Sequence, residues 1–430
     1  MSVDDSRNGK PLAELASARL IDTLFGRRSR RFGLGMEIPS GPLEFHSKPS
    51  PMPLSELERT ALILCGAGVS GWATGLEHSD FDENPAGCNL ALRLGGRTFP
   101  SAGATGATEL MITDDSGTSI TRFRDLEPNR PSGVSSPDGF ARQIERYSPH
   151  IVRLSDRRAP IGTISTPGSL IEKWCFDRPG TTIFVPIIDL TQNMLNRFAI
   201  LIASGAAIYD SARGRLCGSE SIPRDSARRV TLAEIELQVI ENAAGEAAII
   251  CHNIALACEA IGLGGWMFSA DNPTDLALAF SADAIAGHGI RIEKDRSGEP
   301  NPVGIDACFE TLGPAYVSDM RAAVDRFVDL KFGPGGAYDP YEYRGPYRNS
   351  WRVKVETGRY SPELIERLAG VAIYIHDTYG RFPATLPAVS LRTGIQVSHI
   401  DAAFYERSFG ADSYLASHRE HMRNWHDQAD

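Results

Sequence analysis

The chain has 430 residues, of which 42% are hydrophobic and 23% charged. This is an ordinary globular composition, long enough for one large domain or two. The formal net charge of −10 at pH 7 argues against nucleic acid or an anionic membrane as the main partner. Residues 1–10 are polar and acidic, without the pattern of a signal or transit peptide, and we expect them to be disordered.

Cysteine usage and hydropathy indicate where the protein works. The seven cysteines are scattered and odd in number, and no two are spaced as Cys-x-x-Cys. This usage is typical of buried thiols in a reducing compartment. No run of about eighteen residues is free of polar side chains, so the sequence predicts no membrane-spanning segment. We therefore expect a cytoplasmic protein.

The first predicted element is an amphipathic helix over residues 12–25, which carry apolar side chains at helical spacing. A basic cluster, Arg-Arg-Ser-Arg-Arg at 27–31, follows it directly. Guanidinium groups and a hydroxyl are donors that bind phosphate. The alternative is a solvated basic turn, which is the usual role of such runs.

A second helix and a hairpin come next. Ser55 and Glu58 form a capping-box pattern, which predicts a helix start, and the helix should continue to about Cys65. Further on, the segment 97–103 leads into a strand over 107–113. A turn follows, and the chain returns as a strand, so this region predicts a β-hairpin.

The stretch 125–230 is the least readable part of the sequence, and we treat it as a lid or insertion. Within it, residues 181–188 read as a strand and 189–203 as a helix.

A long apolar helix is expected to dominate the fold. Thr231 and Glu234 form another capping box, and the apolar run 243–261 is rich in alanine and covers most of the helix circumference. Glycines 262, 264 and 265 end it. They also leave room for a flat group beside the backbone. The simplest interpretation is a core helix with a glycine C-cap.

The region 301–430 is predicted to be a helical C-terminal extension. It contains two pairs of possible metal ligands at suitable spacing, His399-x-Asp401 and His418-x-x-His421. Surface and interface positions are the favoured interpretation for these histidines, so the sequence predicts no metal site.

Three segments resemble the nitroreductase-like flavoprotein family when taken together. The cluster 27–31 matches an Arg-x-Ser-x-Arg pattern that follows the first helix of that family. The segment RTFPSAGATGATELMI resembles its Pro-Ser segment, and AGEAAIICHNIALACEAIGLGGW resembles its central helix. The order of these segments is nearest to the SagB-type branch, the thiazoline/oxazoline dehydrogenases. The resemblance covers roughly residues 12–270.

The resemblance implies an α+β nitroreductase-like fold over residues 11–300, with a central mixed sheet flanked by helices. It also implies FMN at a homodimer interface. The family pattern places the cofactor against residues of these segments: Arg27, Arg28, Ser29, Arg31, Pro100, Ser101, Gly103, Asn253, Gly264, Ser269 and Ala270. In the family, a backbone amide donates to flavin N5, and counting places that amide at Ser269 or Ala270.

The activity implied is an FMN-dependent oxidoreductase that transfers a hydride between flavin N5 and a small organic or natural-product substrate. The direction and the use of NAD(P)H stay open. Peptide tailoring by azoline oxidation and a non-catalytic flavin-binding module are the alternatives. The branch carries a catalytic Lys-Tyr pair shortly before the central helix, and the sequence has no such pair near Thr231. No catalytic residue is therefore assigned.

Overall fold

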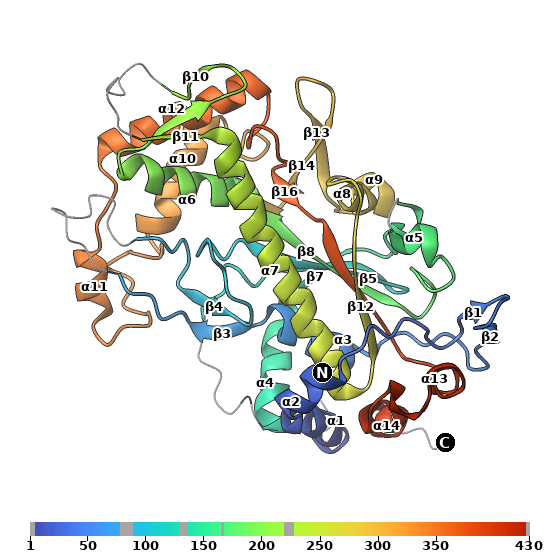
Figure 1. The fold of residues 1–430 in the computed structure, drawn as a ribbon. Helices are drawn as coiled ribbons and strands as arrows, with labels where there is room; N and C mark the ends of the chain where they lie inside the picture. The colour runs from blue at the N-terminus through green and yellow to red at the C-terminus, as the bar shows by residue number, and fades with distance from the viewer. Residues whose placement is uncertain are drawn as a thin grey trace.

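The computed structural model describes residues 5–77, 89–128, 134, 136–164, 167–218 and 228–426. It is an α+β protein in which one seven-stranded sheet is crossed by a long central helix (Figure 1). The helices are α1 (Asp5–Ser17), α2 (Leu20–Gly26), α3 (Glu56–Ala67), α4 (Pro137–Tyr147), α5 (Pro167–Ile171), α6 (Leu190–Ala203), α7 (Leu232–Ile261), α8 (Asp275–Ala279), α9 (Ala282–Ile285), α10 (Met320–Phe332), α11 (Ser350–Glu356), α12 (Pro362–Tyr379), α13 (Ala402–Phe409) and α14 (Ala416–Trp425).

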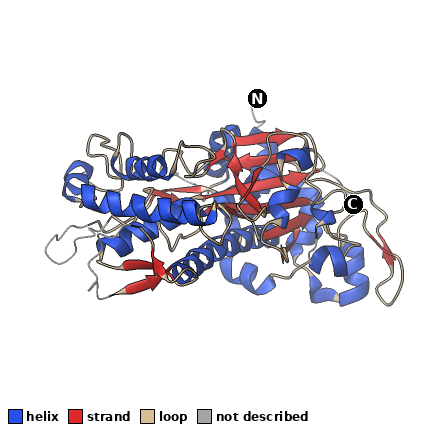
Figure 2. Cartoon of the chain, turned by 90° about the horizontal axis from the view of Figure 1, so that it is seen from above, coloured by secondary structure: helices blue, strands red, loops and turns tan. Residues whose placement is uncertain are grey.

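The main sheet has the strand order β12-β17-β8-β5-β6-β7, with β16 paired to β8. Figure 2 shows strands in red and the helices around them in blue. Its strands are β5 (Thr108–Asp114), β6 (Gly117–Thr121), β7 (Ile151–Ser155), β8 (Thr182–Asp189), β12 (Gly264–Ser269), β16 (Val389–Ser390) and β17 (Thr393–Ser398). The smaller sheets and ribbons contain β1 (Glu37–Ile38), β2 (Phe45–His46), β3 (Val69–Trp72), β4 (Gly95–Arg97), β9 (Ala207–Asp210), β10 (Arg215–Leu216), β11 (Arg229–Thr231), β13 (Arg291–Lys294), β14 (Pro300–Ile305) and β15 (Phe309–Glu310).

The α+β class is confirmed, but the expectation of a mixed central sheet is wrong. Every pair of neighbouring strands in the main sheet is antiparallel over the part of the chain that the structure describes. Short returns such as the turn between β5 and β6 reverse the chain, and only antiparallel strands can be joined that way.

The C-terminal region is not a purely helical extension. β17 lies between β12 and β8, so residues 393–398 supply an inner strand of the main sheet. Its side chains Ile395 and Val397 are fully buried. The separation of 301–430 as a helical addition is therefore wrong for this part.

The N-terminal segment is helical earlier than expected. α1 begins at Asp5, within the segment 1–10 that was expected to be disordered, and residues 1–4 lie outside the described part. The single helix expected over 12–25 is two helices, α1 and α2, separated at residues 18–19.

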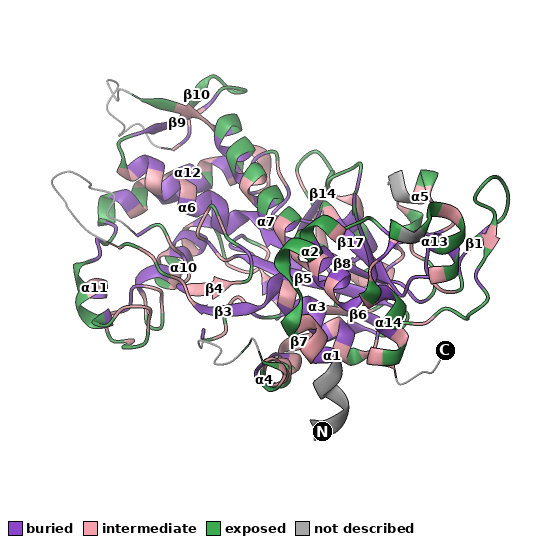
Figure 3. Ribbon diagram, turned by 60° about the horizontal axis from the view of Figure 1, so that its bottom comes forward, coloured by how far each residue is buried: buried purple, intermediate pink, exposed green. Residues whose placement is uncertain are grey.

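α7 lies across one face of the sheet and packs against β8, β12 and β17. α3 and α6 also pack against α7. Its start is the predicted capping box, and it ends at Gly262 in the left-handed conformation (φ 86°). α7 is the one helix in the described ranges that is long and apolar enough to cross a membrane, and 56% of its apolar stretch is buried against this fold, as in a core helix. Figure 3 shows the strands β5 and β8 buried and α2 largely exposed.

The outward stripe of α7 is made of small and polar side chains. Ala244, Gly245, Ala248 and His252 are exposed along it. Ala247, in contrast, is only 6% exposed and faces the core of its own chain. The two adjacent alanines therefore have different environments.

The close packing of α3 on α7 generates a stability prediction. A Cβ at Gly66 would stand 2.6 Å from Cγ1 of the buried Ile254, which is shorter than any ordinary contact. Gly66→Ala should therefore overpack the contact and lower the free energy of unfolding by about 1–3 kcal/mol. Denaturant unfolding measures it.

Gly313→Ala is the matched control, because a Cβ there meets nothing within 4 Å and its φ is not positive. This variant should leave the stability unchanged or raise it slightly, since alanine restricts the unfolded chain. Equal stability of the two variants would contradict the packing described between α3 and α7.

Candidate functional site

The basic cluster 27–31 leaves α2 and passes the carboxyl end of α7 and the start of β12. The backbone amide of Arg28 donates to Oε2 of Glu259 at 3.4 Å. The carbonyl of Arg30 lies against Gly264, where a Cβ would stand 3.0 Å from it. The fold thus brings together two segments that the sequence analysis had joined only by resemblance.

Arg30 is a structural residue in this loop. Its guanidinium donates to both carboxylate oxygens of Glu259, at 2.9 and 2.7 Å, and Nε donates to the carbonyl of Ser413 at 2.9 Å. Each side chain of the ion pair is only 2% exposed. Burial raises the pKa of Glu259, and Arg30 opposes that rise. Because its groups already bond to each other in the protein interior, this ion pair is not free to bind a ligand.

Arg27 and Ser29 are in the opposite situation. Both are exposed, and neither side chain makes a hydrogen bond or ion pair to any residue that the structure describes. The guanidinium of Arg28 donates to the carbonyls of Phe25 and Arg27 at the end of α2. Arg27 and Ser29 are therefore the groups of the cluster that are available to an anion.

Arg31 is partly exposed and has an ion-pair partner, so it is intermediate between the buried Arg30 and the exposed Arg27. It is paired with Glu172, and its guanidinium carbon stands 4.8 Å from the ring centroid of Trp266 on β12. Phe176 packs edge-on against that indole at 5.7 Å between centroids. Arg31 thus lies at the sheet edge, next to the strand that follows α7.

A cavity of about 550 Å³ lies beside Phe176. Lys173, Trp174 and Asp177 line it, together with Glu37 of β1 and Pro39 directly after that strand. Its size is that of a pocket for a small organic molecule.

The strand β12 limits which backbone groups can meet a cofactor. The amide of Ala270 donates to the carbonyl of Arg392 at 2.9 Å, so it is already used within the sheet. Ser269, the residue before Ala270, lies opposite Thr393 of β17. Bonded and non-bonded pairs alternate along antiparallel strands, so the backbone of Ser269 does not bond to β17. Because β12 is the edge strand, the Ser269 amide points away from the sheet.

The room expected beside the glycines after α7 is filled by the chain itself. A Cβ at Gly264 would stand 2.7 Å from Ile400, besides its contact with Arg30. A Cβ at Gly262 would stand 2.2 Å from the carbonyl of Ser417. Gly264 is thus required by the packing of its own chain, and no flat group can lie on that side of it.

The Pro100–Gly103 segment lies elsewhere along α7. The hydroxyl of Ser101 donates to Glu246, which is 3% exposed. Glu246 precedes Glu259 by thirteen residues, or about 20 Å along the helix axis. One chain alone therefore does not bring Pro100, Ser101 and Gly103 to the basic cluster.

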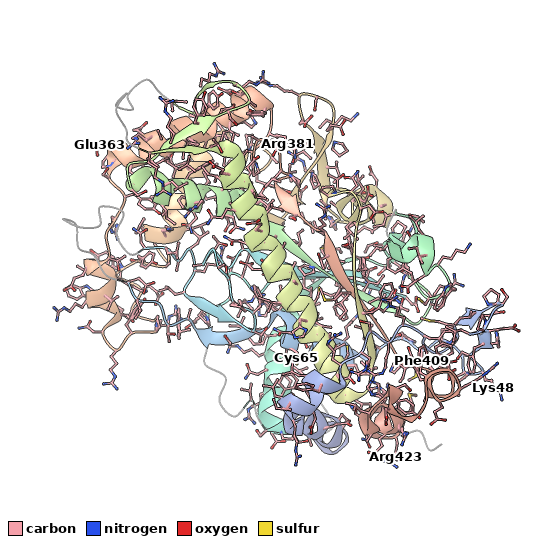
Figure 4. All side chains as sticks on the ribbon, in the orientation of Figure 1. Lys48, Cys65, Glu363, Arg381, Phe409 and Arg423 are labelled. Carbon is pink, nitrogen blue, oxygen red and sulfur yellow. The ribbon has the colours of Figure 1, made fainter. Side chains whose placement is uncertain are left out.

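A groove of about 390 Å³ lies along α7 between these two places. Asn253 lies in it, and its amide donates to the carbonyl of Thr98 at 3.0 Å. Cys65, labelled in Figure 4, lines the same groove from α3. Nearby, Leu20, Ile21 and Phe25 of α2 are 64%, 63% and 78% exposed. This apolar surface is the kind that a second protein chain covers.

A separate group of side chains lies where α3, β17 and α14 meet. Glu58, His399, His421 and His426 direct their donor atoms to one point, all within 4.8 Å of one another. The prediction that the C-terminal histidines are surface residues is wrong for His399 and His421, each 2% exposed.

The sequence pairs did not identify this group. Asp401 caps α13 by accepting from the amide of Phe404, and Nδ1 of His418 accepts from the amide of Leu415. Glu58 was recognised only as a capping residue, and no spacing pattern pointed to His426.

Comparisons with known proteins are sparse. No protein-family model matches the chain, and no curated protein matches it. Among solved structures, a match is a "putative nitroreductase" from Ralstonia eutropha JMP134, with 15% identity and a TM-score of 0.29, covering 63% of this chain and 76% of that one. This likeness is too distant to assign a family or a reaction.

The buried ion pair generates a prediction that separates it from the exposed arginines. Arg30→Met leaves the Glu259 carboxylate buried without its partner, which should lower the free energy of unfolding by about 3–5 kcal/mol. Thermal and denaturant unfolding measure the loss.

Arg30→Met with Glu259→Leu is the control, because replacing both charges with apolar groups removes the uncompensated carboxylate. It should recover most of the lost stability. A single variant as stable as the double one would contradict the pairing.

Proposed function

We propose that the protein is an FMN-dependent oxidoreductase that transfers a hydride between flavin N5 and a small organic or natural-product substrate. The observation that carries the proposal is the meeting of the basic cluster 27–31 with the end of α7 and the start of β12. These segments are about 230 residues apart in sequence, as the bond from Arg28 to Glu259 shows. They are two of the three segments that resemble the nitroreductase-like family.

The residues present fit the cofactor in part. Arg27 and Ser29 offer exposed donors for the phosphate, in line with the preference of guanidinium and hydroxyl groups for phosphate oxygens. Arg31 stands at the edge of β12, and the outward amide of Ser269 is the donor that we assign to N5. FMN would supply the hydride chemistry, while these groups hold and orient its ring.

We further propose that the site is completed by a second copy of the chain. The segment 100–103 lies about 20 Å along α7 from the basic cluster, so in our proposal it serves the flavin of the partner. The exposed stripe Ala244, Gly245 and Ala248 permits close approach of another helix. The exposed apolar side chains of α2 lie beside the groove along α7. Both surfaces support a homodimer.

A small-molecule substrate has more support than a peptide. The cavity beside Phe176 has a small-molecule volume of about 550 Å³. Lys331 and Tyr360 do form a pair, with Nζ donating to the phenol oxygen at 2.8 Å, but they are buried between α10 and α12. Burial lowers the pKa of Lys331 to about 7. α10, which carries Lys331, lies near the start of α7 and away from the basic cluster (Figure 1). The pair therefore does not replace the missing Lys-Tyr pair of the azoline dehydrogenases.

The purified protein should be yellow and release FMN on denaturation, as identified by mass spectrometry. Arg27→Ala should weaken FMN binding by about 2 kcal/mol, or about thirtyfold, since it removes charge-assisted hydrogen bonds to the phosphate. Flavin titration followed by fluorescence measures the affinity.

Arg19→Ala is the matched control, because Arg19 is another exposed arginine, 86% accessible, at the start of α2. It should bind FMN as the parent protein does. Release of FAD, or a protein that binds no flavin even with added FMN, would refute the proposal. Unchanged affinity in Arg27→Ala would refute the phosphate assignment.

Ala248→Leu should disrupt the proposed dimer, because a large side chain on the exposed stripe holds the second helix away, at a cost of about 1–3 kcal/mol. Dimer and flavin should be lost together, as light scattering and absorbance would show. Ala233→Leu, exposed on the first turn of α7, is the control and should change neither. A parent protein that is monomeric and still binds FMN would contradict the shared site.

A further inference from the structure

The four side chains Glu58, His399, His421 and His426 form a compact arrangement. The Nε2 atoms of His399, His421 and His426 stand 3.1, 2.8 and 2.9 Å from the same oxygen, Oε1 of Glu58. The Nε2 atoms of His399 and His426 are 3.2 Å apart. Donor atoms bound to a tetrahedral zinc ion at 2.0–2.1 Å stand about 3.3 Å from one another. These four separations are within about 0.5 Å of that edge length, and all four donor atoms lie within 4.8 Å of one another.

Hydrogen bonds alone do not account for this arrangement. Nδ1 of His399 faces the carbonyl of Met52 at 3.0 Å, and Nδ1 of His421 faces the carbonyl of Ile261 at 2.5 Å. A carbonyl only accepts, so both Nδ1 atoms carry their protons. In the neutral ring, Nε2 then presents a lone pair. The lone pairs on Nε2 of His399 and His421 then face the Oε1 atom of Glu58, with no proton between nitrogen and oxygen to form a hydrogen bond.

The alternative is that the imidazoles are doubly protonated. That would place up to three positive charges around one carboxylate, in a site where the side chains of Glu58, His399 and His421 are 0%, 2% and 3% exposed. Buried charges of the same sign repel strongly and lose their hydration. A cation at the centre satisfies all the lone pairs at once.

The second contacts of the ligands match those of known metal sites. A metal-binding histidine usually donates its other ring nitrogen to a carbonyl or carboxylate, which fixes the ring and its tautomer. The carbonyls of Met52 and Ile261 have this role here. Oε2 of Glu58 accepts from the amide of Ser55 at 2.6 Å, so one oxygen caps α3 and the other faces the histidines.

We propose that Glu58, His399, His421 and His426 bind one Zn²⁺ ion in a closed structural site. Three imidazole nitrogens and one carboxylate oxygen are ligands that zinc accepts, and four protein ligands leave no position for a substrate. The side chain of His426 is the most accessible of the four at 9% exposed. The site is therefore distinct from the proposed flavin site.

The ion would fasten α14 to the body of the protein. Its ligands come from α3, from the end of β17 and from α14 with its C-cap residue. The three histidines follow Glu58 by 341 to 368 residues in the sequence. α14 in turn packs against α7, where the hydroxyl of Ser417 donates to the carbonyl of Glu259 at 3.1 Å. Arg423 in Figure 4 marks α14 at this end of the molecule.

The test is the metal content of full-length protein after removal of any affinity tag, measured by inductively coupled plasma mass spectrometry. We expect about one zinc per chain. His421→Gln and His426→Gln should each lower the zinc content at least tenfold. His418→Gln, buried on the same helix but outside the group, is the matched control and should keep the metal.

Replacement of the metal by Co²⁺ provides a readout that does not depend on the variants folding. The parent protein should show the strong visible absorption bands of tetrahedral Co²⁺, because geometry around the ion is diagnostic. Chelation should remove the bands and lower the unfolding temperature, and added Zn²⁺ should restore it.

Three results would overturn the proposal. The first is a parent protein that contains no zinc and takes up neither Zn²⁺ nor Co²⁺. The second is stoichiometric iron or manganese in place of zinc, or Co²⁺ bands too weak for tetrahedral coordination. The third is folded His421→Gln and His426→Gln protein that retains zinc. None of these measurements depends on flavin, so the metal site and the proposed function can fail separately.

Discussion

Three carboxylates buried on α7 determine which parts of the chain can pack around it. Glu236, Glu246 and Glu259 are 3%, 3% and 2% exposed on a helix that is otherwise mostly apolar. A buried carboxylate must be given partners or it destabilises the fold. Glu236 accepts from Thr385, Glu246 from Ser101 and Thr108, and Glu259 from Arg30. The helix is thereby joined to three distant segments, one of which is the basic cluster of the proposed site.

Local signals in the sequence predicted several helix starts and ends correctly. The capping boxes at Ser55 and Thr231 are both present, and α7 ends at Gly262 as expected. The β5–β6 hairpin is also confirmed. These features depend on residues a few positions apart. The pairing of β17 with β8 and β12 depends on contacts more than a hundred residues apart, which one sequence cannot reveal.

The candidate sites show the same limit. A run of four arginines and a serine was visible in the sequence, but its division into a buried Arg30 and exposed Arg27 and Ser29 follows from the distant Glu259. Glu58 already had a local explanation as a capping residue, which concealed its second role. His426 stands just past the end of α14 and forms no pattern with its neighbours. Only the folded chain brings these residues to His399.

The place of β17 in the sheet has a consequence for how the protein is made. While the ribosome has not yet delivered residues 393–398, β12 and β8 both lack the neighbour that separates them. The nascent chain would then present two unpaired strand edges and the apolar surface that Ile395 and Val397 later cover. Exposed strand edges favour association with other chains. Until residues 393–398 emerge, the nascent chain is therefore prone to aggregate, so its yield in cells should depend on chaperones that shield strand edges up to that point.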